Sequence, residues 1–462
     1  MNMKLTFLGA TGTVTGSKTL LEYTSPHAAK GTQSVLIDCG LFQGYKQLRL
    51  RNREPLPFQP AALSGVVLTH AHIDHSGYLP LLAKNGFRGN VWCTEATAAL
   101  CAILLPDSGH LQEEEAEYAN RGGFSRHSPA LPLYTEAEAR KALRLLTPLP
   151  PGREFSPAAG LRARFWGAGH ILGAAGVSLT AEGKTLSFSG DLGRPNDPIM
   201  CVPQVPAASD WLVLESTYGN RRHDHADPTL QLAEVVNRTI ARGGKVVIPA
   251  FAVGRAQSLL FYLWQLKRLG KIPKSLPVYL NSPMAVDATA LYVRFHAEHR
   301  LSHDDCRAMC TAAQIINTPE QSKRLNERRE PMVIIAASGM ATGGRVVHHL
   351  KAMAPDARNT ILLSGFQAGG TRGARLLAGE PTIKIHGEPI PVRAEVASLH
   401  NLSAHADADE LLQWLRRLPQ APQQLLINHG EPEAADALRV RIQEELGWNC
   451  RVPDYRDVIT LV

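Results

Sequence analysis

Four side chains that can bind a metal ion lie within six residues of one another: His70, His72, Asp74 and His75. The apolar run 65–68 directly precedes them and predicts a buried strand. On the extended end of that strand, His70, His72 and Asp74 would point the same way, and a following turn could bring His75 to the same place. Imidazole and carboxylate groups suit zinc, and the cluster is too dense for one tetrahedral ion. The segment therefore predicts a site for two metal ions.

Two later segments could supply further ligands. Residues 167–170 place His170 after two glycines, and residues 187–191 end a predicted strand with Asp191. Each is weak alone, because a lone histidine after glycines is more often a loop residue and an aspartate at a strand end is usually a turn former. They become persuasive only together with the first cluster.

The order of these motifs resembles that of the metallo-β-lactamase superfamily: Asp38 after a strand, the run His70–His75, then His170 and Asp191. The resemblance implies an αββα sandwich, and the predicted strands agree with it. It also implies that one zinc ion is held by His70, His72 and His170. Asp74 and His75 would hold the other zinc ion, and Asp191 would bridge the two. Asp38 would lie beside the bridging water or behind the ligands.

Three further segments resemble the extra motifs of one branch of that superfamily, the β-CASP family: residues 213–219, 401–407 and 427–431. The match covers nearly the whole chain and is nearest to bacterial and archaeal relatives of the nuclease subunit of the cleavage and polyadenylation specificity factor. RNA-acting members carry histidine in the last motif, whereas the DNA-acting Artemis-like branch carries valine, so His429 implies an RNA enzyme. The resemblance also implies that His429 completes the second zinc site and that Glu215 hydrogen-bonds His405 near the leaving group.

Three glycine-containing loops between these motifs are similar to β-CASP loops: residues 248–255, 338–345 and 365–371. Glycine lets a backbone approach a phosphate closely and arginine contacts it with two donors, so the loops suit a ribose-phosphate chain. The residues expected to bind RNA are Arg255, Ser338, Gly339, Thr342, Gly343 and Arg345. For Arg372 and Arg375, a plain surface role is almost as good an interpretation. The third loop departs from the family at residues 367–370, where an acidic or bulkier residue is expected before the second glycine.

Strand and helix patterns divide the chain into two domains. The first two hundred residues read as short strands, such as 3–9, 16–22 and 34–38, with few long helices before Thr135. From residue 228 onward helices and strands alternate, which is typical of parallel βαβ units. His405 and His429 must join ligands that precede residue 192, so the intervening region has to leave and return. The sequence thus predicts an α/β fold: a metallo-β-lactamase αββα sandwich of residues 1–216 and 396–462, with an inserted parallel-sheet β-CASP cap domain of residues 217–395.

The composition is that of an ordinary globular chain of 462 residues, 44% of them hydrophobic and 20% charged. This excludes a disordered chain, and no 18-residue apolar run predicts a membrane span. The net charge of +7 favours an anionic partner without naming one. The seven cysteines are scattered and include no Cys-x-x-Cys pair, so we expect free thiols and a cytoplasmic protein, with a homodimer as an option.

Two weaker patterns are set aside. Residues 9–16 superficially resemble a dinucleotide-binding loop, but their β-branched residues favour a hairpin where that loop needs a helix. His303, Cys306 and Cys310 are spaced as on one helix face, and three such residues without a fourth ligand are more often an ordinary face than a metal site.

We therefore expect a zinc-dependent ribonuclease with two Zn²⁺ ions that acts on unpaired RNA. Water activated by the metals would attack phosphorus, and His405, oriented by Glu215, would protonate the departing 3′-oxygen, leaving a 5′-phosphate and a 3′-hydroxyl. The residues expected to take part in catalysis are Asp38, Asp74, Glu215 and His405. Internal cleavage is expected, with removal of nucleotides from a 5′ end as a further option. The alternatives are a hydrolase of small esters or thioesters, which has no use for the cap, and a non-catalytic RNA-binding relative, which would lack ligands.

Overall fold

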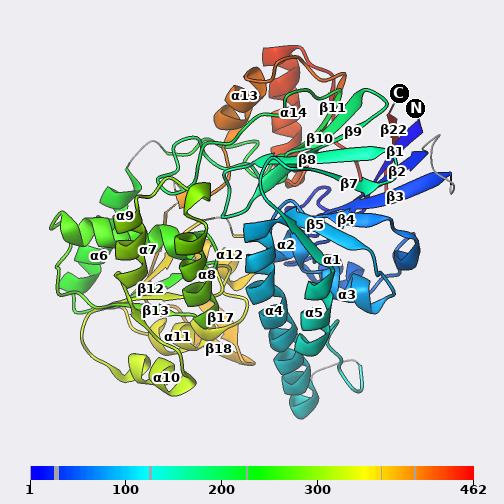
Figure 1. The fold of residues 1–462 in the computed structure, drawn as a ribbon. Coiled ribbons are helices and arrows are strands. Elements are labelled where there is room, and N and C mark those ends of the chain that lie inside the picture. The colour runs from blue at the N-terminus through cyan, green and yellow to red at the C-terminus, as the bar shows by residue number, and fades with distance from the viewer. Residues whose placement is uncertain are drawn as a thin grey trace. The chain divides into compact units, whose positions relative to one another are not determined.

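The chain folds into two units, and the second is inserted into the sequence of the first (Figure 1). The computed structural model describes residues 2–24, 31–123, 127–224, 227–365, 367–399 and 402–461. The first unit combines residues 1–222 with residues 405–462, and the second comprises residues 223–404.

Both boundaries of the insertion differ from those expected at 216/217 and 395/396. Tyr218 forms a parallel bridge with Asp407, and the backbone N–H of Ala408 donates to the carbonyl of Arg221 at 3.0 Å, so the chain up to Arg222 stays with the first unit. The expected second boundary cuts through a strand, β19 (Glu395–Ser398), which pairs with a strand of the second unit.

Two seven-stranded sheets form the first unit. One has the order β22 (Val458–Leu461), β1 (Asn2–Phe7), β2 (Thr19–Thr24), β3 (Thr32–Ile37), β4 (Gly65–Val67), β5 (Asn90–Thr94) and β6 (Leu146–Leu149). The other has the order β21 (Cys450–Arg451), β20 (Gln424–Asn428), β11 (Trp211–Glu215), β10 (Lys184–Phe188), β9 (Ala175–Ala181), β8 (Leu161–Gly167) and β7 (Glu154–Ala158). The pairing of β1 with β22 brings the two ends of the chain side by side (Figure 1).

Each sheet has an antiparallel half and a parallel half. The first is parallel from β3 to β6, and the second is parallel from β10 to β21. The two sheets share one hydrophobic core, in which Phe7 and Leu21 of the first sheet cluster with Phe165 and Val177 of the second. Burying apolar side chains between two sheet faces is the main force that holds such a sandwich together.

Helices complete the first unit: α1 (Lys46–Arg51), α2 (Ile73–Ser76), α3 (Leu79–Lys84), α4 (Glu95–Gly122), α5 (Glu136–Ala142), α13 (Ala408–Arg416) and α14 (Pro432–Leu446). At 28 residues, α4 is a long helix that the sequence did not predict; it lies beside α5 (Figure 1). Pro106 lies inside it, where proline would ordinarily end a helix. The helix persists because Thr94 caps its first turn and its buried half contacts β5 and β6. Tertiary packing overrides local sequence here.

The second unit contains a six-stranded sheet in which every pair is parallel. Its order is β14 (Gln314–Ile315), β13 (Val278–Asn281), β15 (Val333–Ala336), β12 (Val246–Pro249), β16 (Thr360–Leu363) and β19, with a separate hairpin of β17 (Thr382–Ile385) and β18 (Glu388–Pro391). Its helices are α6 (Pro228–Ala241), α7 (Arg255–Arg268), α8 (Pro283–Arg294), α9 (His303–Thr311), α10 (Pro319–Glu327), α11 (Arg345–Met353) and α12 (Arg372–Leu377). The three central strands β15, β12 and β16 are neighbours, so the loops that follow them lie together.

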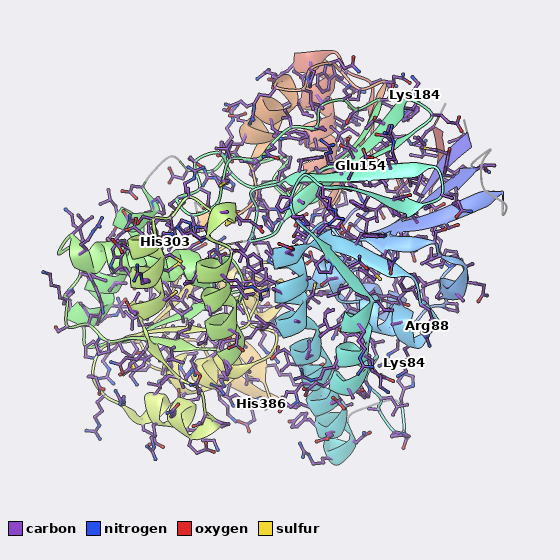
Figure 2. The ribbon with its side chains drawn as sticks, viewed as in Figure 1. Lys84, Arg88, Glu154, Lys184, His303 and His386 are labelled. Atoms are coloured by element: carbon purple, nitrogen blue, oxygen red, sulfur yellow. The ribbon has the colours of Figure 1, made fainter. Side chains whose placement is uncertain are left out.

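The alternation of helices and strands predicted from residue 228 onward is confirmed, and the first strands of the chain lie within a few residues of their predicted bounds. The loop at residues 9–16 leads into β2 and not into a helix, as expected. Among the described residues, no helix is both long and apolar enough to cross a membrane. Exposed charged side chains are spread over both units, for example Lys84 and Lys184 in the first (Figure 2).

Candidate metal centre

The candidate ligands follow the carboxyl ends of strands in both sheets of the first unit. His70 to His75 follow β4, His170 follows β8, Asp191 follows β10 and His429 follows β20. These strand ends share one edge of the sandwich, which is where open α/β sheets place their ligand sites. Residues separated by up to 359 positions in the sequence thereby meet at one place.

The ordered strand is shorter than the sequence predicted. β4 ends at Val67, and Asp74 and His75 lie in the short helix α2, not on an extended strand. The change of direction sends His70 and His72 to one pocket and Asp74 and His75 to a second. The turn is tight enough to need Gly40, because a Cβ atom there would lie 1.6 Å from the carbonyl oxygen of Asp74.

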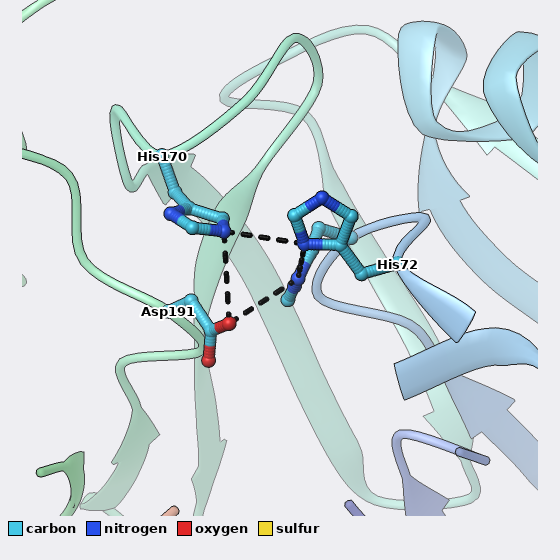
Figure 3. Close-up of side chains that lie close together, drawn as sticks. His72, His170 and Asp191 are labelled. Atoms are coloured by element: carbon cyan, nitrogen blue, oxygen red, sulfur yellow. Dashed lines mark hydrogen bonds and ion pairs between the residues drawn. The ribbon is translucent and has the colours of Figure 1, made fainter. Parts of the chain in front are cut away.

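The first pocket is formed by His70, His72, His170 and Asp191 (Figure 3). His72 Nδ1 lies 3.1 Å from His70 Nε2 and 3.2 Å from His170 Nε2. Asp191 Oδ2 lies 3.4 Å from His70 Nε2 and 3.7 Å from His170 Nε2. Four tetrahedral ligands about 2.1 Å from a zinc ion are roughly 3.4 Å from one another. The spacing of these four atoms therefore fits one zinc ion.

The second pocket is formed by Asp74, His75 and His429. The Nε2 atoms of His75 and His429 are 3.0 Å apart, and Asp74 Oδ2 lies 3.5 Å from His429 Nε2 and 3.9 Å from His75 Nε2. The other oxygen of Asp191, Oδ1, lies 3.3 Å from His75 Nε2. Asp191 thus presents one oxygen to each pocket, which is the geometry of a bridging carboxylate.

The donor set fits metal ions on its own chemistry. Imidazole nitrogens and carboxylate oxygens are the groups that bind zinc, and four or more of them converge in a buried place. Asp191 Oδ1 is buried and forms no hydrogen bond in the structure, an expensive arrangement unless a cation neutralises it. His72 Nδ1 faces two imidazole nitrogens at once, although each neutral ring carries a single proton. A cation in each pocket would satisfy these atoms.

The protonation states suit ligation. Burial holds the pKa of His70 well below its usual value and lowers that of His72, so both rings are neutral donors. Burial would raise the pKa of Asp191, but the surrounding histidines, led by His429 and His75, hold it well below the usual range. His75 is the exception: burial would lower its pKa, but the carboxylates of Asp191 and Asp38 raise it well above that of an ordinary histidine, so a metal ion would have to displace a proton from this ring.

Asp38 lies behind a ligand. Its Oδ2 is 2.7 Å from His75 Nδ1, and its Oδ1 accepts hydrogen bonds from Thr69, at 2.8 Å from the backbone N–H and 3.0 Å from the hydroxyl. These contacts favour the second of the two places that the sequence left open, behind His75, where Asp38 would orient the ring. Such carboxylate–histidine pairs fix the ring and raise its basicity.

The sequence did not single out several residues that support the ligands. The hydroxyl of Thr69 lies 3.1 Å from His70 Nδ1, and that of Thr217 lies 3.2 Å from His429 Nδ1, which leaves Nε2 of both rings for metal. The buried ammonium of Lys18 donates to the carbonyls of Gly16 and Gly40 and so ties down the loop after Asp38. Thr69 directly precedes the first motif and Thr217 lies within the motif at residues 213–219, so the sequence offers a signal for both. It offers none for Lys18, because the role of Lys18 depends on the carbonyl of Gly40, 22 residues away.

His405 and Glu215 form a pair at the side of the first pocket. His405 Nδ1 lies 3.2 Å from both carboxylate oxygens of Glu215, which also accept from the backbone N–H groups of Leu192 at 2.6 Å and Thr217 at 3.2 Å. Burial alone would lower the pKa of His405, but Glu215 raises it above the ordinary histidine value. The ring of His405 is 4.4 Å from that of His170 between centroids. A histidine held this way can keep and deliver a proton beside the metal ligands.

Comparisons with known proteins match this architecture. Residues 28–229 match the model of the metallo-beta-lactamase superfamily, residues 256–376 that of the Beta-Casp domain, and residues 389–453 that of a Zn-dependent metallo-hydrolase RNA specificity domain. Ribonuclease TTHA0252 from Thermus thermophilus is 37% identical over 94% of this chain and 95% of its own length. The chain belongs to the β-CASP family of metallo-β-lactamase-fold hydrolases.

Other relatives are longer than this chain. Transcription termination factor FttA is 32% identical in both Methanocaldococcus jannaschii and Methanosarcina mazei. The match covers 86% and 93% of this chain, but only 63% and 68% of those proteins. A crystal structure of a protein of unknown function from Enterococcus faecalis V583 has a TM-score of 0.53 with 14% identity over the whole of both chains, a likeness of fold alone.

The β-CASP unit (residues 223–404) holds the residues expected to bind RNA. Ser338, Thr342 and Gly343 lie together after β15: the Ser338 hydroxyl is 3.2 Å from that of Thr342 and accepts from the Thr342 N–H at 3.2 Å. Arg255 is buried, with its guanidinium beside Gly365. Asn401 and Phe366 of the expected motifs fall outside the described residues.

Arg345 is engaged within the β-CASP unit. One guanidinium nitrogen donates to Asn281 Oδ1 at 2.9 Å and to the carbonyl of Ile316 at 2.8 Å, and the other donates to the carbonyl of Asn317 at 2.6 Å. Both terminal nitrogens of the guanidinium group therefore donate hydrogen bonds within the protein. Arg345 thereby holds the start of α11 to the ends of β13 and β14, and its contact with a phosphate stays a prediction.

The residues His303, Cys306 and Cys310 lie in the β-CASP unit. Cys306 is buried, and burial raises the pKa of its thiol to about 11. His303 is exposed (Figure 2). Its ring stacks on that of His296 with centroids 3.8 Å apart. Within the described part of the chain, these residues form no group of converging ligands. That these residues form an ordinary helix face stays a prediction.

A buried polar network behind Arg345 gives a pH prediction. Asn281 Nδ2 lies 2.5 Å from His349 Nε2, and His349 Nδ1 donates to Asn326 Oδ1 at 2.6 Å. Nε2 therefore faces a donor, and burial lowers the pKa of His349 from 6.5 to about 4. The unfolded chain takes up the proton near pH 6.5 and the folded chain only near pH 4, so stability is lost as pH falls between these values. The loss should approach about 3 kcal/mol.

The free energy of unfolding is measured by urea unfolding of wild type and His349→Gln across that pH interval. A spectroscopic signal from the β-CASP unit monitors the unfolding. The variant should lose much of the acid-dependent destabilisation. His348→Gln, which replaces the exposed neighbour on α11, should keep it. Equal pH dependence in wild type and His349→Gln would show that another group is responsible.

Proposed function

We propose that this chain is a zinc-dependent endoribonuclease that hydrolyses unpaired RNA with two Zn²⁺ ions, one in each pocket. The observation that supports it most strongly is Asp191, whose two oxygens face two separate sets of imidazole nitrogens. The RNA specificity domain model at residues 389–453 and the printed name of the Thermus thermophilus relative support RNA as the substrate. A role in transcription termination is not carried over, because the chain spans about two thirds of the FttA proteins.

The ligand roles follow from the geometry. His70, His72 and His170 would hold one ion, Asp74, His75 and His429 the other, and Asp191 both. Bound zinc lowers the pKa of water from about 15.7 to about 7 and stabilises charge on phosphoryl oxygens. Asp38, Thr69 and Thr217 keep the ligand rings in place.

His405 would complete the reaction. When water adds to phosphorus, the bond to the 3′-oxygen breaks, and that oxygen needs a proton to leave as a hydroxyl. Glu215 engages His405 Nδ1, so Nε2 is the nitrogen that can give a proton. The products are a 5′-phosphate and a 3′-hydroxyl, and the 2′-hydroxyl takes no part. The alternative, a hydrolase of small esters, would not need to recognise a nucleotide.

The test is cleavage of an unpaired RNA labelled separately at each end. We expect internal fragments with 5′-phosphate and 3′-hydroxyl ends, and continued cleavage after a single 2′-deoxy substitution at the scissile nucleotide. All-DNA strands should be poor substrates, because 2′-hydroxyl contacts are how proteins tell RNA from DNA. Asp191→Ala protein purified in parallel excludes a contaminating nuclease. A 2′,3′-cyclic phosphate end would overturn the mechanism, and equal turnover of single-stranded DNA would overturn the RNA assignment only.

Two finer expectations remain predictions. All seven cysteines are free in the structure, which supports a reducing compartment such as the cytoplasm. The homodimer awaits a measurement of mass in solution.

A further inference from the structure

An exposed aromatic ring lies among the glycine loops of the β-CASP unit. Phe251 follows β12, and 38% of its surface is exposed. Among the described residues of this unit it is the one exposed phenylalanine, tyrosine or tryptophan; the other exposed large apolar residues there are aliphatic. An exposed aromatic ring does not contribute the stabilisation that its burial would give, so its exposure suggests a function.

The ring rests against the backbone of the neighbouring loop. A Cβ atom at Gly339 would lie 2.7 Å from Phe251 Cδ2 and 2.8 Å from Cε2, so any side chain at Gly339 would displace the ring. The backbone beneath it is also fixed: Ala250 N–H donates to Ala336 at 3.0 Å, and the Phe251 carbonyl accepts from Ala256 at 3.1 Å. One side of the ring is thus supported, while part of it faces solvent.

The supporting loop is itself tied to the third loop. The side-chain amide of Gln367 donates to the carbonyls of Gly339 and Gly365, both at 3.3 Å. Arg372 donates to the carbonyls of Ala341 at 3.1 Å and Thr342 at 2.8 Å. The loops after β12, β15 and β16 therefore form one connected surface. A surface held in place before binding loses less entropy when a ligand arrives.

The charge of this surface suits a polyanion. Residues 249–255, 337–345 and 364–372 contain three arginines and no aspartate or glutamate. Arg372 donates to the loop after β15, and Arg345 donates to groups at the ends of β13 and β14, but the charges of both still raise the local potential. A positively charged groove with an aromatic ring is how proteins bind single strands without reading their sequence.

We propose that Phe251 stacks on a nucleobase of the bound RNA. This inference rests on the proposed function and adds to it a contact with a base, where the other loop residues are suited to the ribose-phosphate chain. Because every base has a flat face, the contact selects unpaired nucleotides and tolerates any sequence. A base that is still paired is not free to stack on the ring, so Phe251 also favours unpaired substrate.

The first experiment compares kcat/KM for an unpaired RNA between wild type and variants of the zinc-loaded full chain. Phe251→Ala should lower it about 5- to 150-fold, the scale of one stacked base. Phe251→Trp should restore most of the loss, whereas Phe251→Leu should not. Tyr118→Ala is the matched control: it removes an aromatic side chain of similar exposure, 44%, from α4 of the other unit and should have no effect. Circular dichroism checks folding of each variant.

A second experiment uses RNAs in which one nucleotide at a time lacks its base. One abasic position should lower kcat/KM for wild type and make no further difference to Phe251→Ala, because both changes remove the same contact. Additive losses at every position, or rescue by leucine as good as by tryptophan, would overturn the stacking role. If wild type cleaves no RNA at all, the proposed function fails. If wild type cleaves RNA and Phe251→Ala matches it, only this inference fails.

Discussion

Replacing Asp191 with alanine should empty both metal pockets and abolish RNA cleavage. Its Oδ2 lies 3.4 Å from a ligand nitrogen of the first pocket and its Oδ1 lies 3.3 Å from one of the second, so one substitution removes a donor from each. It also removes the negative charge that offsets two dications. Loss of an outer partner of a ligand alone costs 10- to 100-fold in metal affinity, so loss of a shared ligand should exceed about 100-fold. Elemental analysis of dialysed protein measures the zinc, which should fall from about two ions per chain toward none.

Asp74→Ala is the informative companion. Asp74 belongs to the second pocket alone, with its oxygen 3.5 Å from His429 Nε2. This variant should keep about one zinc ion per chain while losing cleavage. If Asp191→Ala retained the wild-type zinc content, Asp191 would not be a ligand. If Asp74→Ala lost both ions, the two pockets would not be independent.

The sequence predicts the candidate ligands because several metal-binding residue types lie within a few positions of one another. Four donors between His70 and His75 behind a predicted strand leave few explanations, and the later motifs then take meaning from the first. The assignment of each donor to a pocket could not be derived this way. It depends on the chain turning from β4 into α2, which sends Asp74 away from His70.

Residues that act through another residue were harder to find. Arg345 follows a glycine loop, as a phosphate-binding arginine would, yet its guanidinium is taken up by Asn281 and by two carbonyls. Those partners lie 28 to 64 residues away along the chain, so no local pattern reveals them. The exposure of Phe251 has no local signal either, because a phenylalanine after a strand is expected to be buried, whereas 38% of the surface of Phe251 is exposed.

The same limit explains α4 and the domain boundaries. A proline inside a helix and a weak apolar pattern argue against α4, and only its packing on β5 and β6 overrides them. The return of the chain from the insertion is set by β19, whose pairing with β16 is a long-range choice. Local sequence predicts well whether a segment prefers helix or strand. It predicts poorly which distant strand that segment will pair with.

His405→Ala should retain both zinc ions and lose 10²–10⁴-fold in the rate of RNA cleavage, the scale of general acid catalysis. His405 Nδ1 is 4.0 Å from the nearest Asp191 oxygen and 3.2 Å from both oxygens of Glu215, so it lies closer to the Glu215 carboxylate than to the bridging Asp191. With 19% of its side chain exposed, it can reach a substrate. Single-turnover cleavage gives the rate, and elemental analysis gives the zinc. His303→Ala, which removes an exposed histidine from α9, is the control and should change neither.

A second substrate separates proton donation from every other role of His405. The p-nitrophenyl ester of a nucleotide has a leaving group that departs without a proton, so His405→Ala should cleave it nearly as fast as wild type does. A residue that held metal or positioned RNA would be needed for both substrates equally. A similar loss on the nitrophenyl ester and on RNA, or a clear loss of zinc, would therefore show that His405 is a ligand or a positioning residue. If only the RNA reaction suffers, the proton that the 3′-oxygen takes as it leaves comes from His405.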